Sequence, residues 1–313
     1  MKLIQSFIHF YNKLSTFGKI LIFIVFLLMF IVFFKSIMPA KEGMTMNTDG
    51  KEGNFLYKEG TDVYDDFYVG IYDHLVFNNV KNDFEVGTII NNSSPTTTSV
   101  IADIGCGTGH HVASLSAKNL KVIGIDVSPS MITEAKNQAP GAEFKIGNAL
   151  DNGLFNQNSL THVLCLYFTL YYFKDKRQFF NNCMDWLMPG GYLIVHLVDR
   201  ETFDPILPPG NPLYVVSPQK YAKERITSTK ITFNDFVYNS DFNLDKSNNI
   251  ATFEEKFKFN DGKVRKQQQQ LYMEDTSTIV NMAQECGLVL HSKVDLLQCA
   301  YENQYLYIFT KPV

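Results

Sequence analysis

The middle of the chain alternates between strand-like and helix-like segments, and this alternation constrains the fold more than any other feature. Apolar runs at 99–104 and 121–126 are typical of buried strands, and each is followed by an amphipathic segment, at 110–118 and 130–137. Parallel strands need helical crossovers of this kind, so the pattern predicts a layered α/β fold. Further strands are predicted at 143–146, 162–166, 192–198, 288–296 and 304–310, and further helices at 62–80, 176–187 and 276–286.

The alternation is interrupted between residues 201 and 273. Five prolines occur between 205 and 218, and the segments after them alternate polar and apolar residues, with a hairpin turn expected at Asp261-Gly262. This predicts an antiparallel β insertion at 201–273. The main domain then consists of residues 61–200 and 274–313, with a polar loop at 91–99 and a turn at 189–191.

The N-terminus contains fifteen consecutive apolar residues at 20–34, between Lys19 and Lys35. A helix over 17–38 would be about 33 Å long at ~1.5 Å per residue, which is enough for a bilayer core of ~30 Å. No small-residue cleavage site follows before Pro39, so we expect a retained single-pass anchor within residues 1–38 rather than a signal peptide. The glycine-containing segment 39–60 is predicted to be a linker. Lysines flank the span on both sides, so the positive-inside rule gives no orientation.

Charge and cysteine content narrow the partners and the compartment. The net charge of −4 provides no global positive field for DNA or RNA, so nucleic acid is not an expected partner. Local basic clusters at 220–230 and 263–266 leave an RNA substrate as an alternative. The five cysteines show no metal-binding or disulfide spacing, which indicates reduced thiols and a domain that faces the cytosol.

The segment D-I-G-C-G-T-G at 103–109 lies between the first predicted strand and the following helix. Its glycines allow a tight turn and a close approach of a ligand, and the next helix offers free N–H groups to an anion. A dinucleotide fingerprint would need its third glycine at position 110, where His110 stands, so a nicotinamide or flavin cofactor is disfavoured. At the end of the next strand, Asp126 can accept hydrogen bonds from both hydroxyls of a ribose.

With I-G-I-D-V-S-P-S-M-I at 123–132, G-N-A at 147–149 and L-M-P-G-G-Y-L at 187–193, the glycine loop resembles that of the class I S-adenosylmethionine-dependent methyltransferases. The resemblance covers residues 61–200 and 276–313. It implies a Rossmann-like, doubly wound, mostly parallel seven-stranded sheet. It also implies S-adenosylmethionine as cofactor and in-line transfer of its methyl group.

The resemblance also implies a set of cofactor-binding residues. Asp103 would hold the loop and the amino group of the methionine moiety, and Asp126 would bind the ribose. Val127 and Met131 would pack on the adenine, and Asn148 with Ala149 would meet its edge. Relatives often carry an acid at the position of Asn148. The amide oxygen of Asn148 can still accept a hydrogen bond. The full set is Asp103, Gly105, Cys106, Gly107, Gly109, Asp126, Val127, Met131, Asn148, Ala149 and Leu166.

No catalytic dyad and no metal site are evident. Tyr167 and Tyr171, after the fourth predicted strand, are the candidates to face a substrate, although aromatic residues at this spacing also pack in cores. His110 and His111 are adjacent, so they point to different faces of a helix, and no third ligand accompanies them. His196 lies inside an apolar strand and is expected to be a paired core histidine.

These features predict a membrane-anchored methyltransferase that acts on a small-molecule, lipid-like or protein acceptor. Two segments, 61–80 and 201–273, are expected to form the lid that determines the acceptor. The alternative is a membrane protein that keeps the fold but not the turnover and serves as a binding or structural module. Asn148 and the absence of the acid that relatives carry near Thr161 or His162 motivate this alternative.

Overall fold

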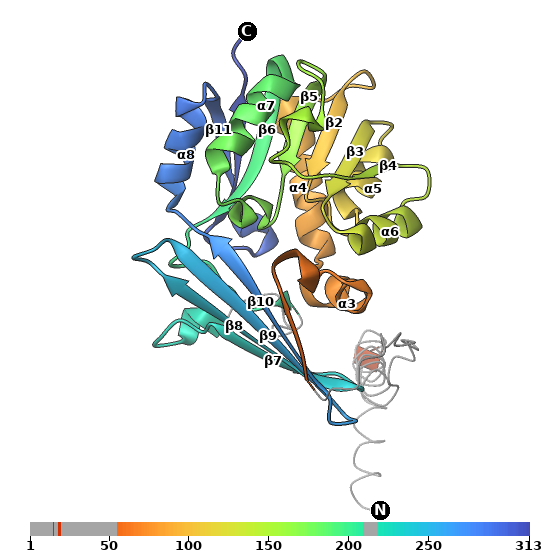
Figure 1. Ribbon diagram of the computed structural model, residues 1–313, viewed down its shortest axis with the longest axis vertical. Helices are drawn as coiled ribbons and strands as arrows, with labels where there is room; N and C mark the ends of the chain where they lie inside the picture. The colour runs from red at the N-terminus through yellow and green to blue at the C-terminus, as the bar shows by residue number, and fades with distance from the viewer. Residues whose placement is uncertain (1–14, 16–17, 20–54, 209–217) are drawn as a thin grey trace, which may run out of the picture. The chain divides into compact units, whose positions relative to one another are not determined.

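The computed structural model describes residues 15, 18–19, 55–208 and 218–313 (Figure 1). The chain divides into two compact units, residues 1–46 and 47–313, and the fold below is that of the second. In the described part of the chain, no helix is long and apolar enough to cross a membrane. The predicted anchor at 17–38 falls almost entirely outside the described residues, as does most of the predicted linker, so the anchor stays a prediction.

The core is a seven-stranded sheet with the order β11-β12-β6-β5-β2-β3-β4. Neighbouring strands from β4 to β6 are parallel, while β12 runs antiparallel to β6 and β11 antiparallel to β12. This confirms the Rossmann-like, mostly parallel sheet. Its strands are β2 (Val100–Ile104), β3 (Lys121–Asp126), β4 (Glu143–Ile146), β5 (Leu160–Cys165), β6 (Leu187–Val198), β11 (Val289–Asp295) and β12 (Gln304–Thr310).

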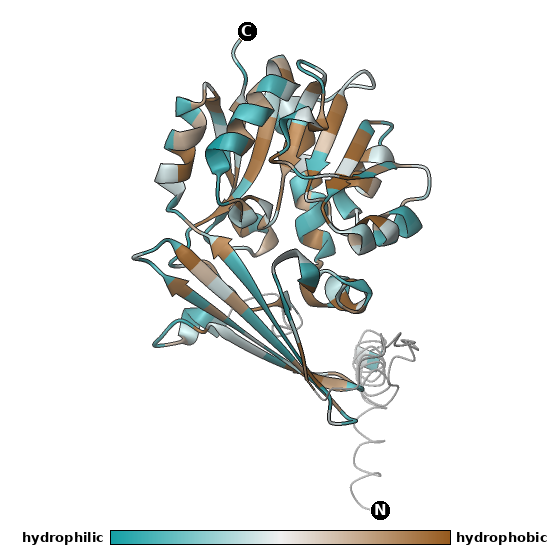
Figure 2. Cartoon of the chain, viewed as in Figure 1, coloured by the Kyte–Doolittle hydropathy of each residue, from teal (hydrophilic) through white to brown (hydrophobic). Residues whose placement is uncertain are grey.

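Helices cover both faces of this sheet because the central strands are apolar on both sides, as their colour in Figure 2 shows. On one face, Phe179 of α7 and Ile279 of α8 are buried in the same hydrophobic cluster. On the other face, Ile89 of α4, Leu115 of α5 and Ile132 of α6 form a second cluster. The helices are α3 (Asp66–Val76), α4 (Asn79–Ser93), α5 (His110–Ser116), α6 (Pro129–Gln138), α7 (Lys176–Trp186) and α8 (Thr276–Glu285).

A second sheet has the order β1-β10-β9-β8-β7. Strands β7 to β10 form an antiparallel meander, which confirms the predicted insertion, and the turn at Asp261-Gly262 joins β9 to β10 with Gly262 at a φ of 89°. The strands are β1 (Phe55–Glu59), β7 (Ser228–Thr232), β8 (Phe236–Asp245), β9 (Ile250–Phe259) and β10 (Val264–Tyr272).

Several boundaries differ from the prediction: among them, the predicted helix at 62–80 is divided between η1 (Gly60–Val63), α3 and the start of α4. Residues 55–59, assigned to the linker, form β1, which pairs in parallel with β10. Helix α4 runs to Ser93 and takes the first residues of the predicted loop at 91–99. Strand β6 begins at Leu187 and includes the predicted turn at 189–191, because Gly190 and Gly191 exchange backbone hydrogen bonds of 2.9 Å with Lys311, just after β12.

Candidate functional site

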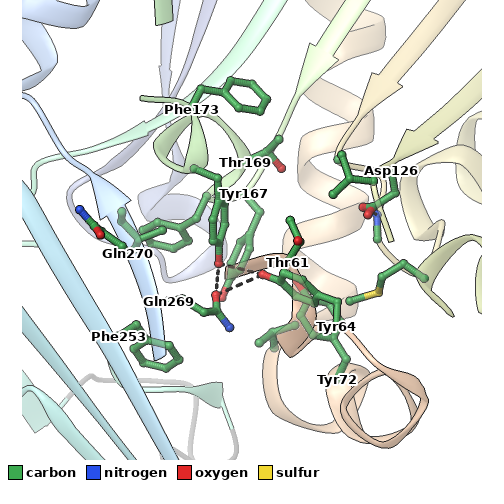
Figure 3. A pocket seen from close by; sticks show the side chains of 18 of the residues that line it. Thr61, Tyr64, Tyr72, Asp126, Tyr167, Thr169, Phe173, Phe253, Gln269 and Gln270 are labelled. Atoms are coloured by element: carbon green, nitrogen blue, oxygen red, sulfur yellow. Dashed lines mark hydrogen bonds between the residues drawn. The ribbon is translucent and has the colours of Figure 1, made fainter. Parts of the chain in front are cut away.

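A cavity of about 620 Å³ lies between the carboxyl ends of β2, β3 and β5 and the second sheet (Figure 3). Gly105, Asp126 and Ala149 line it from the first side, and Phe253 and Gln269 line it from the second. The volume falls within the ~300–1,000 Å³ of small-molecule sites, and the carboxyl edge is where doubly wound sheets bind their ligands.

The glycine loop between β2 and α5 has a conformation that only glycine adopts without strain. Gly105, Gly107 and Gly109 have φ angles of 66°, 53° and 87°. A Cβ atom at Gly105 would lie 2.4 Å from Thr169 Cγ2, and one at Gly109 would lie 2.9 Å from Phe144 Cζ. Gly105 and Gly107 line the cavity, as expected, whereas Gly109 packs against the protein and allows the turn into α5.

Asp126 lines the cavity at the end of β3 and connects two loops (Figure 3). Its Oδ2 accepts a hydrogen bond of 3.0 Å from the Gly107 backbone N–H, and its Oδ1 accepts one of 2.9 Å from the Ser128 N–H. Burial raises the pKa of Asp126 above its ordinary value. Each oxygen can still accept a second hydrogen bond, so the carboxyl can bind a diol while it fixes the glycine loop.

Asp103 lies in β2, behind the cavity wall. It is 2% exposed, and within the described residues its Oδ2 has no hydrogen-bond partner. Burial raises the pKa of this carboxyl to about 6. Asp103 does not line the cavity, so the expectation that it contacts the amino group of the cofactor directly is not met.

The residues predicted to surround adenine are only partly brought together. Val127, Met131 and Ala149 line the cavity. Asn148 does not: it is exposed, and its Oδ1 accepts a hydrogen bond of 3.0 Å from the Leu150 N–H. The local Asx turn therefore uses the oxygen that was expected to meet the adenine edge.

Cys106 and Leu166 also lie outside the cavity wall. Leu166 is 4% exposed in the core on the α4 side of the sheet. The Cys106 side chain points to Gly124 of β3, where a Cβ atom would come within 2.9 Å of its sulfur. Both side chains support the loop through packing.

The two catalytic candidates have different surroundings. Tyr167 lines the cavity just after β5, in a left-handed backbone conformation with a φ of 50°. Tyr171 is fully buried, and its hydroxyl accepts a hydrogen bond of 2.9 Å from the Val198 N–H. The expectation that Tyr171 faces a substrate is therefore wrong, because this hydroxyl joins η3 (Thr169–Tyr172) to β6.

A tyrosine and glutamine cluster on the cavity wall was not predicted. The hydroxyls of Tyr64 and Tyr172 are 2.8 Å apart, and both are within hydrogen-bonding distance of Gln269 Oε1 (Figure 3). A signal existed in the sequence, because tyrosines recur every four residues at Tyr64, Tyr68 and Tyr72. The stripe predicts an amphipathic helix of the lid at 61–80 but assigns no role to the individual tyrosines.

Glu255 of β9 supports this cluster from within the second sheet. Its carboxyl oxygens accept hydrogen bonds from the hydroxyls of Tyr68 (2.8 Å) and Tyr238 (2.7 Å) and from Nε2 of Gln267 (2.7 Å) and Gln269 (3.3 Å). Burial raises the pKa of this carboxyl. The network fixes the orientation of the Gln269 amide, whose oxygen faces Tyr64 and Tyr172.

The histidines have structural partners. His110 Nε2 lies 2.8 Å from Asp73 Oδ2, and His111 Nε2 lies 2.9 Å from Glu85 Oε2. His196 is fully buried, as predicted, with Nε2 3.0 Å from Gln304 Oε1. In the part of the chain that the structure describes, no group of three His, Cys, Asp or Glu side chains could hold a metal ion.

Known proteins are similar to part of this chain. Residues 101–191 match a family described as a methyltransferase domain. The trans-aconitate 2-methyltransferase of Escherichia coli O1:K1 / APEC is 30% identical over 102 residues, which are 32% of this chain and 39% of that protein. The chain spans about two-fifths of the length of the curated relatives it matches.

Solved structures resemble the fold over most of the chain. The CcbJ methyltransferase from Streptomyces caelestis has a TM-score of 0.61 at 15% identity, covering 81% of this chain and 100% of that one. A second structure is that of CalS10, an amino pentose methyltransferase from Micromonospora echinaspora, with S-adenosylmethionine bound. It has a TM-score of 0.55 at 15% identity and covers 79% of this chain and 97% of that one. At these identities the likeness concerns the fold alone.

The sheet order and the glycine loop define a Rossmann-like domain with a nucleoside site at its carboxyl edge. The matched family and relatives specify it further: residues 101–191 form a methyltransferase domain, and the curated relatives that match this region include a probable S-adenosylmethionine-dependent methyltransferase, which identifies S-adenosylmethionine as the cofactor.

The residues present fit this cofactor. Asp126 offers two carboxyl oxygens to a ribose, and Met131 and Ala149 offer apolar contacts to adenine. The open backbone at Gly107 leaves room for the methionine portion, since a Cβ atom there would meet nothing closer than 3.9 Å. The partnerless Oδ2 of Asp103 supplies negative charge behind the loop.

Proposed function

We propose that the protein transfers the methyl group of S-adenosylmethionine to an acceptor bound in the same cavity. One observation carries this proposal: the cavity that holds Asp126 and the glycine loop continues to a wall of aromatic and amide side chains from the second sheet. The cofactor supplies a methyl group activated by a sulfonium. A reaction of this kind needs alignment of a nucleophile and exclusion of water more than it needs a dedicated base.

Each part of the chain has a role in this scheme. The glycine loop and Asp126 bind and orient the cofactor. The segment from η1 (Gly60–Val63) to α3 and strands β8 to β10 close the cavity from the other side, exclude water and select the acceptor. Tyr167 is the candidate to contact the acceptor, because it lines the cavity just after β5, at the carboxyl edge of the sheet.

The proposal includes attachment to a membrane. Its basis is the apolar segment at 20–34 and the linker that follows, and an anchored enzyme has ready access to lipid-like or protein acceptors as well as small molecules. A domain facing the cytosol agrees with the cysteines, since all five are free thiols.

The test is transfer of a labelled methyl group. The full chain in a non-ionic detergent, with methyl-labelled S-adenosylmethionine and a total cell extract, is expected to label an acceptor, and the Asp126→Ala variant is expected to label none. A known methyltransferase in a parallel reaction controls the conditions. Cofactor binding without label in any fraction would instead support the inactive binding module.

A further inference from the structure

Two tyrosine hydroxyls on the cavity wall are left unpaired by the described part of the chain. Tyr72 and Tyr167 both line the cavity, and neither hydroxyl has a hydrogen-bond partner among the described residues. Tyr64 and Tyr172, by contrast, already bond to each other and to Gln269. A partly buried hydroxyl without a protein partner is a binding position, because leaving it unpaired in a closed site costs free energy.

These two hydroxyls lie on the cofactor side of the cavity. The Tyr72 ring is 3.9 Å from the position of a Cβ atom at Gly107, and Figure 3 shows Tyr72, Tyr167 and Asp126 around the same space. Burial raises the pKa of both phenols, so they stay protonated at neutral pH and can donate as well as accept a hydrogen bond. They are therefore placed to contact the group that receives the methyl.

The charges around the cavity restrict the acceptor. No lysine, arginine or histidine is found among the described residues that line the cavity, whereas Glu59, Asp126 and Asp204 do line it. An acceptor carboxylate would lose its hydration and gain no cationic side chain from the described part of the wall. The rest of the wall is largely aromatic and aliphatic, which favours an apolar body and tolerates a cation over a ring face.

We propose that the acceptor is a non-anionic amphipathic molecule, with an apolar body and one hydroxyl or amine nucleophile, and that Tyr72 and Tyr167 bind the nucleophilic atom. In the reaction, the acceptor's O or N forms a bond to the methyl carbon while the bond from that carbon to sulfur breaks. The electron pair of the broken bond stays on sulfur, giving a neutral thioether, and the acceptor's proton passes to water. This inference rests on the proposed function.

The test uses three probes that share a phenyl ring: 2-phenylethylamine, 2-phenylethanol and 3-phenylpropanoate. Each is titrated into the full chain, in detergent and saturated with S-adenosylhomocysteine, and binding is followed by saturation-transfer NMR. We expect the amine or the alcohol to bind at least about tenfold more tightly than the carboxylate. Which of the two binds more tightly identifies the nucleophile class.

The double variant Tyr72→Phe/Tyr167→Phe removes only the two hydroxyls. We expect it to bind the preferred probe about tenfold more weakly, as for the loss of one or two hydrogen bonds, and to bind S-adenosylhomocysteine within about twofold of the unmodified chain. Tyr221→Phe is the matched control, because Tyr221 is 79% exposed and does not line the cavity.

Carboxylate binding as tight as that of the other probes, or binding of none of the three, would overturn the acceptor class. Unchanged probe binding in the double variant would overturn the role of the two tyrosines. Failure of the proposed function has a different signature. The unmodified chain would then not bind S-adenosylhomocysteine even before a probe is added, and the inference would fail with it.

Discussion

We expect cofactor binding to depend most on Asp126, because its carboxyl lines the cavity and also accepts a hydrogen bond from the glycine loop. Asp126→Ala removes the hydrogen bonds to the Gly107 and Ser128 N–H groups as well as the contacts to a ribose. Charge-assisted hydrogen bonds contribute ~1.5–3 kcal/mol each, so we expect S-adenosylhomocysteine to bind about 100-fold more weakly or worse, measured by calorimetry.

The matched control is Asp151→Ala. Asp151 accepts a similar hydrogen bond, of 2.9 Å from the Gly153 N–H, but is exposed and does not line the cavity. The affinity of this variant for S-adenosylhomocysteine is expected to stay within about twofold of that of the unmodified chain. Equal losses in the two variants would contradict the role assigned to Asp126.

Asp103 gives the free energy of unfolding a pH dependence of its own. Burial raises its pKa from 3.8 to about 6, so the folded state holds the proton to a higher pH than the unfolded state does. The contribution of Asp103 to stability is therefore fully present below about pH 4 and is lost as the pH rises to about 6. The loss is on the order of 3 kcal/mol at neutral pH.

The Asp103→Asn variant has no such titration. In urea unfolding at a series of pH values, the unmodified chain should lose stability relative to the variant between pH 4 and pH 7. The readout is the difference between the stabilities of the two proteins at each pH. The other titrating groups are the same in both proteins, so their contribution cancels. Parallel curves over this range would show that Asp103 is ionised at no cost to the fold.

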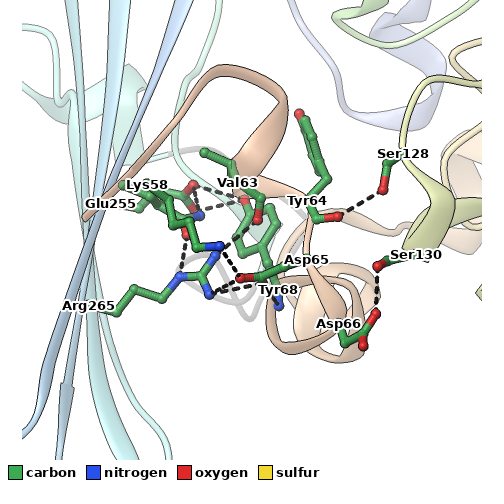
Figure 4. A network of polar contacts seen from close by, with 11 residues as sticks. Lys58, Val63, Tyr64, Asp65, Asp66, Tyr68, Ser128, Ser130, Glu255 and Arg265 are labelled. Carbon is green, nitrogen blue, oxygen red and sulfur yellow. Dashed lines mark hydrogen bonds and ion pairs between the residues drawn. The ribbon is translucent and has the colours of Figure 1, made fainter. Parts of the chain in front are cut away.

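At the scale of elements, Arg265 of β10 connects the second sheet to the start of α3 (Figure 4). Its Nη1 lies 2.9 and 2.8 Å from the two carboxyl oxygens of Asp65, its Nη2 donates to Val63 O at 3.0 Å, and its Nε donates to Gln267 Oε1 at 2.8 Å. Asp65 in turn accepts from the Tyr68 N–H and caps α3. One guanidinium thus orients the helix that carries the cavity tyrosines.

Arg265→Met keeps most of the side-chain volume and removes the charge. Breaking a buried pair costs ~3–5 kcal/mol, and we expect about 2 kcal/mol because the Asp65 side chain is 31% exposed and water can replace part of the pairing. The midpoint of urea unfolding measures the change. The exposed neighbour Lys266, substituted in the same way, should leave the midpoint almost unchanged, and a similar shift in both variants would argue against the connection.

Elements with a local pattern were predictable from the sequence. Strands at Lys121–Asp126, Glu143–Ile146 and Gln304–Thr310 have their predicted bounds, because each is a short apolar or alternating run that ends at a polar or turn residue. The glycine loop was equally predictable, since positive φ angles at alternating positions require glycine.

Elements defined by distant partners were not predictable. The segment 55–59 has an exposed, mixed sequence, and it is a strand only because β10, about 200 residues later, pairs with it. Helix α4 buries Lys81, Asn82 and Glu85 beside Val86 and Ile89, so polar residues interrupt the apolar pattern of its inner face. The Gln269 side of the cavity depends on the register of β9 against β10, which the local sequence does not determine.

At the scale of the whole molecule, sedimentation with membranes tests whether residues 17–38 anchor the folded domain. The full chain is expected to sediment with membranes even after an alkaline wash. An inserted helix is held by burial of its apolar surface, so weakening the electrostatic contacts at the membrane surface does not release it. A chain that lacks residues 1–38 should remain in the supernatant. Sedimentation of the shortened chain, or release of the full one, would contradict the anchor at 17–38.

The central claim is that the cavity at the carboxyl edge binds S-adenosylmethionine rather than another nucleotide. Calorimetric titration of the full chain with S-adenosylhomocysteine, beside an identical titration with NADH, tests this most directly. The expected result is one S-adenosylhomocysteine per chain, with an affinity lost in Asp126→Ala, and no heat of binding with NADH. No binding of S-adenosylhomocysteine at millimolar concentration, or binding of NADH in its place, would contradict the claim.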